Sequence, residues 1–235
     1  MARSTRKFRR PHHEAIARAL RAMDSEFLLG AGCFFGGGTQ LAMALGEYRE
    51  SRDVDFLCSS RRGFRALREE VTSQSLGRVL RREIELARDV RTDRDGIRTF
   101  FVVGGLRLKF EIVFESRLDL AGDLDRALGV AVLRPEHAVA EKLLANADRG
   151  LDESTSARDL IDLAFAAAHF GKPVLDRGFA LAEEAYGGAV GRYLAAAVHA
   201  FRDRKRAADC IASLAVDDVA TLRRGLRVLR NRVGN

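Results

Sequence analysis

Apolar and polar residues follow different periods in the two parts of this chain. Before Pro135, short apolar stretches alternate with polar residues and are separated by glycine-rich or charged turns, a pattern typical of strands mixed with short helices. After Pro135 the chain is rich in alanine and leucine, and apolar residues recur at helical spacing. The pattern therefore predicts an α+β protein, with a mixed α/β part over residues 1–134 and an all-helical part over residues 135–235.

Turn residues and periodicity place the individual elements. In the first part we expect helices at 11–23, 39–45 and 63–71, and strands at 54–57, 97–103 and 106–114. An irregular strand is expected over 27–35, interrupted by Gly30-Ala31-Gly32. The sequence Asp93–Gly96 is typical of a hairpin turn, whereas 78–90 is ambiguous because its charges are dense. In the second part we expect helices near 136–148, 157–170, 174–186, 189–207 and 217–232.

A glycine-rich turn followed by two carboxylates is the most informative feature of the first part. The glycines run into the short helix predicted at 39–45, and Asp53 and Asp55 follow on an apolar strand. Glycines let a backbone approach an anion closely, and a helix N-terminus presents N–H groups to it. Carboxylates at i and i+2 of a strand project from one face, where they can share a hard cation such as Mg²⁺. Exposed acids at a strand boundary are the simpler alternative.

Two well-known nucleotide-binding motifs with glycine turns do not match this segment. A dinucleotide-binding fingerprint would need a third glycine where Phe35 stands, and no Gly-Lys-Ser/Thr sequence follows that would make a P-loop. The glycines can also serve simply to let a strand and a helix pack closely. The turn alone therefore does not define a function.

The strand predicted at 106–114 alternates cleanly between an apolar and a polar face, and Glu111 shares the polar face with Lys109. If this strand pairs near the one that carries Asp53 and Asp55, the sheet presents three carboxylates together. Such a cluster needs a cation or basic side chains to offset its repulsion. Two interpretations stay open: a metal-binding triad, or an exposed Glu111 that pairs with Arg107 or Lys109.

Two predicted helices of the second part carry charges inside apolar stretches. Lys142 lies on the first, in a polar stripe with Asn146 and Arg149. Asp159 and Asp162 lie on the second, where an intrahelical pair of Asp162 with Arg158 is the simplest account. In the alternative account, Lys142 binds phosphate and the acids orient basic residues or substrate.

Composition narrows the class of protein. The 235 residues are 47% hydrophobic, which supports a folded core, and no apolar stretch could span a bilayer. The basic N-terminus lacks the apolar segment of a signal peptide, so we expect a cytoplasmic protein. The net charge of +7 favours anionic partners such as nucleotides or RNA, although composition alone slightly favours a solvated arginine-rich surface.

Two further residue types carry expectations. We expect the cysteines to be reduced thiols, and we expect His12 and His13 to be exposed at the start of a helix.

Four pieces of sequence occur in an order that is known from one family. They are Gly37–Ala42, Arg49-x-Ser51-x-Asp53-Val54-Asp55-Phe56, Lys109–Ile112, and Glu141-Lys142 followed by Arg149, Arg158-Asp159 and Asp162. With these motifs the chain resembles the AbiEii/AbiGii-type nucleotidyltransferase toxins of bacterial type IV toxin–antitoxin systems. The resemblance covers residues 35–165, and Gln40 departs from the alanine that many members have. Nothing beyond residue 170 matches a motif.

This resemblance implies a DNA-polymerase-β-like nucleotidyltransferase fold, with a mixed sheet and helices, and an appended helical domain. It implies NTP as substrate and Mg²⁺ or Mn²⁺ held by three catalytic carboxylates: Asp53, Asp55 and Glu111. It assigns NTP binding to Gly37, Gly38, Thr39, Arg49 and Ser51. Lys142 would contact the nucleotide, and Asp159 or Asp162 would be a nearby active-site acid.

We therefore expect a metal-dependent enzyme that moves an NMP group from NTP to an acceptor hydroxyl. The acceptor stays open between an RNA or tRNA 3′ end, a protein hydroxyl and a small molecule, and the family implies an antitoxin protein as partner. The alternatives are a nucleotide- or RNA-binding module that retains the fold without turnover, and a metal-dependent nuclease.

Overall fold

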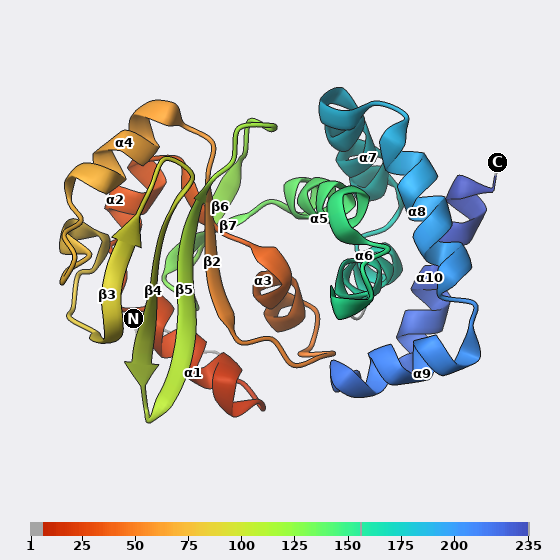
Figure 1. Cartoon of the computed structure of the whole chain (residues 1–235), viewed down its shortest axis with the longest axis horizontal. Helices are drawn as coiled ribbons and strands as arrows, with labels where there is room; N and C mark the ends of the chain where they lie inside the picture. Colours follow the sequence, from red (N-terminus) through yellow and green to blue (C-terminus); the bar gives the residue numbers. More distant parts are fainter. Residues whose placement is uncertain (1–6, 156, 235) are drawn as a thin grey trace. The chain divides into compact units, whose positions relative to one another are not determined.

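The computed structural model describes residues 7–155 and 157–234 of the chain. They form two compact units, which Figure 1 shows in the colours of the sequence. The first unit takes the chain up to Gln40 and then Ser51–Arg134, and the second takes Leu41–Glu50 together with the chain from Pro135 onward. The segment Leu41–Glu50 therefore belongs with helices that lie far along the sequence.

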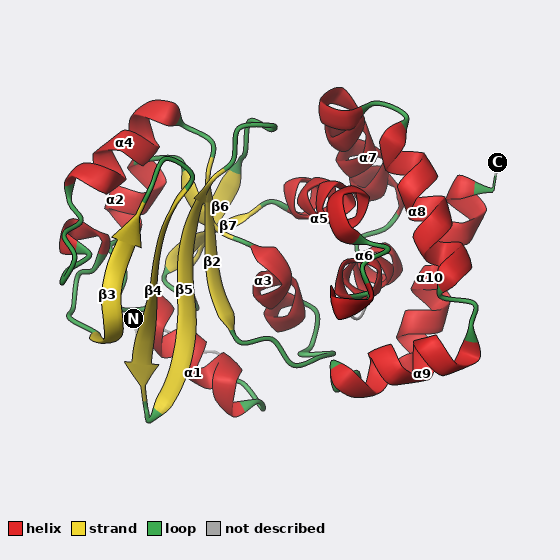
Figure 2. Cartoon of the chain, in the orientation of Figure 1, coloured by secondary structure: helices red, strands yellow, loops and turns green. Residues whose placement is uncertain are grey.

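A mixed sheet forms the centre of the first unit (Figure 2). Over the described residues it has seven strands in the order β3-β4-β5-β2-β1-β7-β6. The strands are β1 (Cys33–Phe35), β2 (Asp53–Cys58), β3 (Glu85–Thr92), β4 (Gly96–Val103), β5 (Leu106–Phe114), β6 (Gly122–Asp125) and β7 (Val130–Leu133). Strand β2 is parallel to β5, and β1 is parallel to β7, whereas the other neighbours are antiparallel.

Short helices cover the apolar face of this sheet. They are α1 (Pro11–Leu20), α2 (Ser25–Gly30), α4 (Arg61–Glu69) and the 3₁₀ turn η1 (Gly77–Val79). The remaining short helix of this part of the chain, α3 (Gly37–Ala44), begins beside Asp55 instead. Helix α1 packs against β4 and β5, α2 against β1 and β7, and α4 against β2. The aromatic core is tight: the ring of Phe110 lies 4.6 Å from that of Phe101 and 6.1 Å from that of Phe56. Because strand side chains alternate between faces, the polar residues of β2 and β5 project from the opposite face.

The second unit is helical apart from its turns and linking segments. After the end of α3 it contains α5 (Pro135–Arg149), the 3₁₀ turn η2 (Glu153–Thr155), α6 (Arg158–His169), α7 (Lys172–Tyr186), α8 (Ala189–Ala200), α9 (Arg204–Ser213) and α10 (Val219–Val233). Helix α10 packs on α6 so closely that a Cβ on Gly225 would lie 1.7 Å from the carbonyl oxygen of Ala164. Only glycine permits this contact.

Three local predictions were wrong for identifiable reasons. Residues 27–29 form part of helix α2 rather than a strand, because the Asp24 side chain accepts a hydrogen bond from the Phe27 N–H and caps the helix. The helix expected over 189–207 is two helices, since Asp203 caps α9 in the same way. His13 is fully buried on α1 rather than exposed. The short strands β6 and β7 were not predicted.

Candidate functional site

Three carboxylates gather on the polar face of the sheet. Asp53 and Asp55 alternate with the fully buried Val54 on β2, so both carboxylates project from the same face. The parallel register places Asp53 beside Lys109 and Asp55 beside Glu111 on β5. The strand pairing thus brings together the acids that the sequence placed more than fifty residues apart.

Glu111 is held by two basic side chains. Arg98 Nε donates to Glu111 Oε1 and Lys109 Nζ donates to Glu111 Oε2, both at 2.5 Å. Burial alone would raise the pKa of Glu111, but these two donors outweigh it and lower the pKa below its usual value. The ion-paired interpretation of Glu111 therefore describes this structure, with Lys109 and the unpredicted Arg98 as partners.

Arg98 could have been found from the turn that joins β4 to β5. The two glycines of this turn leave Val103 opposite Leu106, and counting back along the hairpin places Arg98 opposite Glu111. The tight turn is therefore a local signal for this pair. The pairing of Asp55 with Glu111 had no such local signal, because the two strands are parallel and far apart in sequence.

The glycine turn is built against Asp55. Helix α3 begins at Gly37, whose φ of +72° is a left-handed conformation that favours glycine. A Cβ on Gly37 would lie 2.8 Å from Asp55 Oδ2, and the Gly36 N–H donates to the backbone oxygen of Asp55 (2.9 Å). The start of a helix, with its N–H groups free of intrahelical partners, therefore lies directly beside a carboxylate.

Two hydroxyl groups link this helix to the residues just before β2. Thr39 Oγ1 and Ser51 Oγ lie 2.7 Å apart, and the Thr39 side chain is fully buried. Thr39 thus fixes the first turn of α3 relative to Ser51, two residues ahead of Asp53. In this structure the Thr39 hydroxyl is therefore engaged with Ser51.

Substituting Gly37 tests this arrangement. The Gly37→Ala variant should displace the Asp55 carboxylate, because the added Cβ occupies its place, and should lose about 1–2 kcal/mol of stability from the left-handed backbone alone. Gly32→Ala is the matched control in the same unit, since its φ is +66° but its Cβ would meet the nearest atom at 3.4 Å. Thermal melts and nucleotide-transfer assays should show a similar stability loss in both variants and loss of transfer only in Gly37→Ala. Equal activity of the two variants would contradict the proposed contact.

The remaining candidate residues form a buried ion-pair network in the second unit. Asp162 on α6 is fully buried and accepts hydrogen bonds from Arg49 Nε (2.6 Å), Arg49 Nη2 (2.9 Å) and the Tyr48 hydroxyl (2.7 Å). Lys142 Nζ on α5 lies 2.8 Å from Asp162 Oδ2. Burial raises the pKa of Asp162, but Arg49 and Lys142 outweigh it and hold the pKa below its usual value.

Asp159 extends the network by one turn of α6. It accepts hydrogen bonds from Lys142 Nζ (3.0 Å) and from Arg149 Nε (2.8 Å), and its side chain is 1% exposed. Burial raises its pKa, and the two cations lower it to a value far below that of an ordinary aspartate. Lys142, which lies between both acids, is thus fully paired in this structure, and these acids raise its pKa although burial opposes them.

The network corrects the sequence analysis in two respects. The intrahelical pair of Asp162 with Arg158, one of the two accounts that the sequence left open, does not form; the partners of Asp162 come from α5 and from the segment after α3. Tyr48 was missed altogether, although it is 2% exposed and its ring stacks on Phe165 at 3.8 Å. The only signal for Tyr48 in the sequence was its position directly before Arg49 of the family motif.

Backbone contacts hold the same segment in place. The Glu50 N–H donates to the Leu214 carbonyl (3.0 Å), and the Tyr48 carbonyl accepts from the Asp217 N–H (3.1 Å). Tyr48, Arg49 and Glu50 are therefore anchored to α6 and to the loop after α9 by both side chains and backbone. The chain continues directly from this segment to Ser51 and strand β2.

The predicted site residues divide between the two units. Gly37, Gly38, Thr39, Ser51, Asp53, Asp55 and Glu111 belong to the first, and Arg49, Lys142, Asp159 and Asp162 to the second. Over residues 7–155 and 157–234, no group of three His, Cys, Asp or Glu side chains is arranged to hold a metal ion. The engagement of Glu111 by Arg98 and Lys109 is consistent with this.

Two crystal structures from Helicobacter pylori share the fold. One is described as a candidate nucleotidyltransferase and matches with a TM-score of 0.54 and 17% identity, covering 94% of this chain and 95% of that chain. The other, JHP933, matches with a TM-score of 0.51 and 18% identity, covering 94% and 92%. The sheet with its appended helices therefore has the architecture of this group of proteins.

The family follows from the sequence match. Residues 18–226 match the model of one protein family, which is described as nucleotidyl transferase AbiEii toxin, type IV toxin–antitoxin system. Because the match covers most of the chain, the protein belongs to this family and is a nucleotidyltransferase by class. No curated protein sequence matches the chain significantly. None of the helices in the described part of the chain is long and apolar enough to cross a membrane.

Proposed function

We propose that this protein transfers a nucleoside monophosphate from an NTP to an acceptor hydroxyl, with Mg²⁺ or Mn²⁺ bound at Asp53 and Asp55, and that the acceptor is RNA. The observation that carries the proposal is the contact between Gly37 and Asp55: the N-terminus of the helix that follows β1 lies against a carboxylate on the neighbouring strand β2. Triphosphate and a divalent cation need these two groups side by side.

The donor set fits a hard divalent cation. Asp53 and Asp55 offer carboxylate oxygens from one face of β2, and neither side chain is fully buried. Glu111 would complete the set by exchanging its contacts with Arg98 or Lys109, which are themselves partly exposed. When bound, the metal would neutralise phosphate charge and acidify the acceptor hydroxyl.

The residues of the chain bind and orient the substrate. The N–H groups of Gly37, Gly38 and Thr39 would receive the phosphate oxygens, and glycine at two of these positions lets the backbone approach them. Arg98 and Lys109 supply positive charge on the same face of the sheet. Glu111, once released, would be placed to accept the proton of the acceptor hydroxyl.

Lys142, Asp159, Asp162 and Arg49 act in a different way under this proposal. Both charged partners of Lys142 are aspartates, so a direct contact with phosphate requires it to leave one of them. We assign to this network the task of holding Tyr48–Glu50, the segment that leads directly into Ser51 and β2. They are positioning residues for the site on the sheet.

Membership of a type IV toxin–antitoxin family supports an antitoxin protein as a further partner. The specific NTP is open, and RNA is proposed as acceptor because the chain carries 40 basic against 33 acidic residues.

A transfer assay tests the function. The protein is incubated with bulk tRNA and each NTP labelled at the α-phosphate, with Mg²⁺ or with EDTA. We expect label in the RNA and release of pyrophosphate, both abolished by EDTA. Stabilisation by Mg²⁺–NTP in a thermal melt without transfer would instead identify a binding module, and shortening of RNA without NTP would identify a nuclease.

A further inference from the structure

Helix α10 divides into a buried face and a cationic face. Leu222, Gly225 and Leu229 recur at helical spacing and are buried against the other helices of the second unit. The outward positions between them carry Arg223, Arg227 and Arg230, which are exposed and follow each other at i, i+4 and i+7. We call these three residues the arginine stripe.

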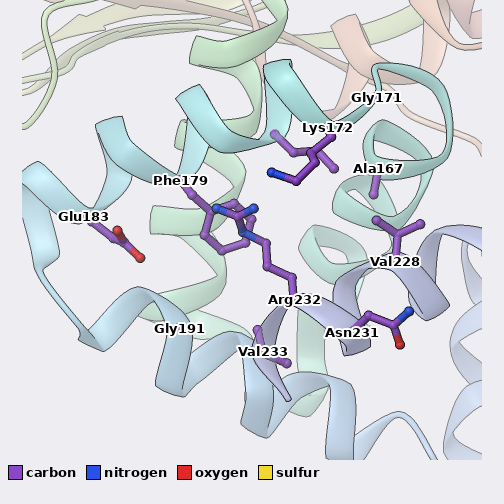
Figure 3. A pocket seen from close by; sticks show the side chains of 11 residues that line it. Ala167, Gly171, Lys172, Phe179, Glu183, Gly191, Val228, Asn231, Arg232 and Val233 are labelled. Atoms are coloured by element: carbon purple, nitrogen blue, oxygen red, sulfur yellow. The ribbon is translucent and has the colours of Figure 1, made fainter. Parts of the chain in front are cut away.

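Arg232, on the flank of α10 beside the stripe, shows how an arginine finds partners within the chain. The pocket in Figure 3 is lined by the end of α10, by α7 and by residues of α6 and α8, and its volume is about 770 Å³. Here the Arg232 guanidinium lies 4.0 Å from the centroid of the Phe179 ring and pairs with Asp176. Arg232 therefore has two partners on a neighbouring helix.

The arginine stripe has no comparable partners. Among the described residues, no acidic side chain lies within ion-pair distance of Arg223, Arg227 or Arg230, and α10 itself contains no acidic residue. Other helices of the chain place an acid one turn from an exposed base, as in the pairs Glu14–Arg18, Arg65–Glu69 and Lys172–Asp176. Like charges at i and i+4 destabilise a helix, so the stripe carries a repulsion that an external anion would relieve.

The geometry of the stripe matches a phosphate backbone. Seven residues of α-helix separate the first and last arginine by about 10.5 Å, and a duplex strand presents one phosphate per ~3.4 Å of its axis, so about three phosphates lie along this length. Protein interfaces centre on large apolar or aromatic anchors, whereas the positions beside the stripe offer the small Ala220, the polar Asn231 and the half-buried Val219 and Leu226, with no aromatic side chain on α10. Exposed charge without an exposed large apolar anchor favours nucleic acid over an acidic protein.

We propose that the arginine stripe of α10 docks the sugar–phosphate backbone of RNA. The choice of RNA rests on the proposed function, in which RNA is the acceptor. The stripe gives affinity and orientation without sequence specificity, because its contacts are with phosphates. Binding therefore depends strongly on salt and does not need NTP or a metal ion.

Fluorescence anisotropy with a labelled RNA hairpin of about 20 nucleotides, titrated between about 50 and 200 mM KCl, tests the proposal. The variant R223Q/R227Q/R230Q is compared with R202Q/R204Q/K205Q, which removes the same charge from exposed residues beside and on α9. Thermal melts confirm that both variants fold. We expect the α10 variant to lose roughly tenfold or more in affinity at low salt and to lower the salt slope by about three, and the control to change little.

Four results would overturn the proposal. Three concern RNA binding: equal losses of affinity in both variants, a larger loss of affinity in the α9 control, and an unchanged salt slope in the α10 variant. The fourth comes from a parallel titration with polyglutamate: an α10 variant that loses affinity for polyglutamate but not for RNA would reassign the stripe to an acidic protein. The assay contains no NTP, so an RNA-binding protein without transferase activity would still support the docking surface while refuting the proposed function.

Discussion

Replacing Asp55 by asparagine is expected to lower nucleotide transfer by at least about a thousandfold while the protein stays folded. Asparagine keeps the shape that packs against Gly37 but removes the charge that a divalent cation needs. Stabilisation of the transition-state charge by a bound metal is worth several kcal/mol, which corresponds to this loss of rate. Asp53→Asn should behave in the same way.

The measurement combines transfer rates with thermal melts in the presence and absence of Mg²⁺–NTP. Wild type should gain stability from the ligand, and the two variants should gain little. Asp89→Asn is the control, because Asp89 is an exposed carboxylate on β3 of the same unit. A variant at Asp55 that transfers nucleotides at the rate of the Asp89 control would refute the carboxylate assignment.

The elements of the sheet were predictable where the signal was local. Residues 106–114 alternate so regularly that β5 was predicted at its observed bounds, and Asp93–Gly96 is the turn between β3 and β4. The shared face of Asp53 and Asp55 also follows from strand geometry alone. The contact of Gly37 with Asp55 does not, because it depends on the angle at which α3 leaves β1.

The buried network shows why the rest could not be predicted. Tyr48 and Arg49 find their partner more than a hundred residues later, on α6. Nothing in the sequence of Leu41–Glu50 indicates that it packs with the helical unit. Local ion pairing favoured Arg158 as the partner of Asp162, but a buried acid requires buried donors, and these came from two other segments, Tyr48–Arg49 and α5.

Removal of Asp162 should cause the largest loss of stability. It is fully buried and accepts from Arg49, Lys142 and Tyr48. Asp162→Asn would leave Arg49 and Lys142 buried with one acidic partner fewer, and breaking a buried ion pair in this way costs about 3–5 kcal/mol. Urea unfolding measures this value, and Asp176→Asn is the control. Asp176 also has two basic partners, but its side chain is 39% exposed, so its loss should change stability little.

The same network predicts sensitivity to acid. The pKa values of Asp159 and Asp162 are lowered in the folded protein, so their contribution is fully present above the ordinary aspartate pKa of about 4 and is lost as pH falls below it. The free energy of unfolding of wild type should therefore decline more steeply below about pH 4 than that of Asp162→Asn. Because the network holds Tyr48–Glu50 ahead of β2, Asp162→Asn should also lower transfer at pH values where it remains folded, whereas Asp176→Asn should not. Parallel acid profiles for wild type and Asp162→Asn would show that the network does not stabilise the unit through its charges. Full activity of the folded variant would show that the network does not position the site.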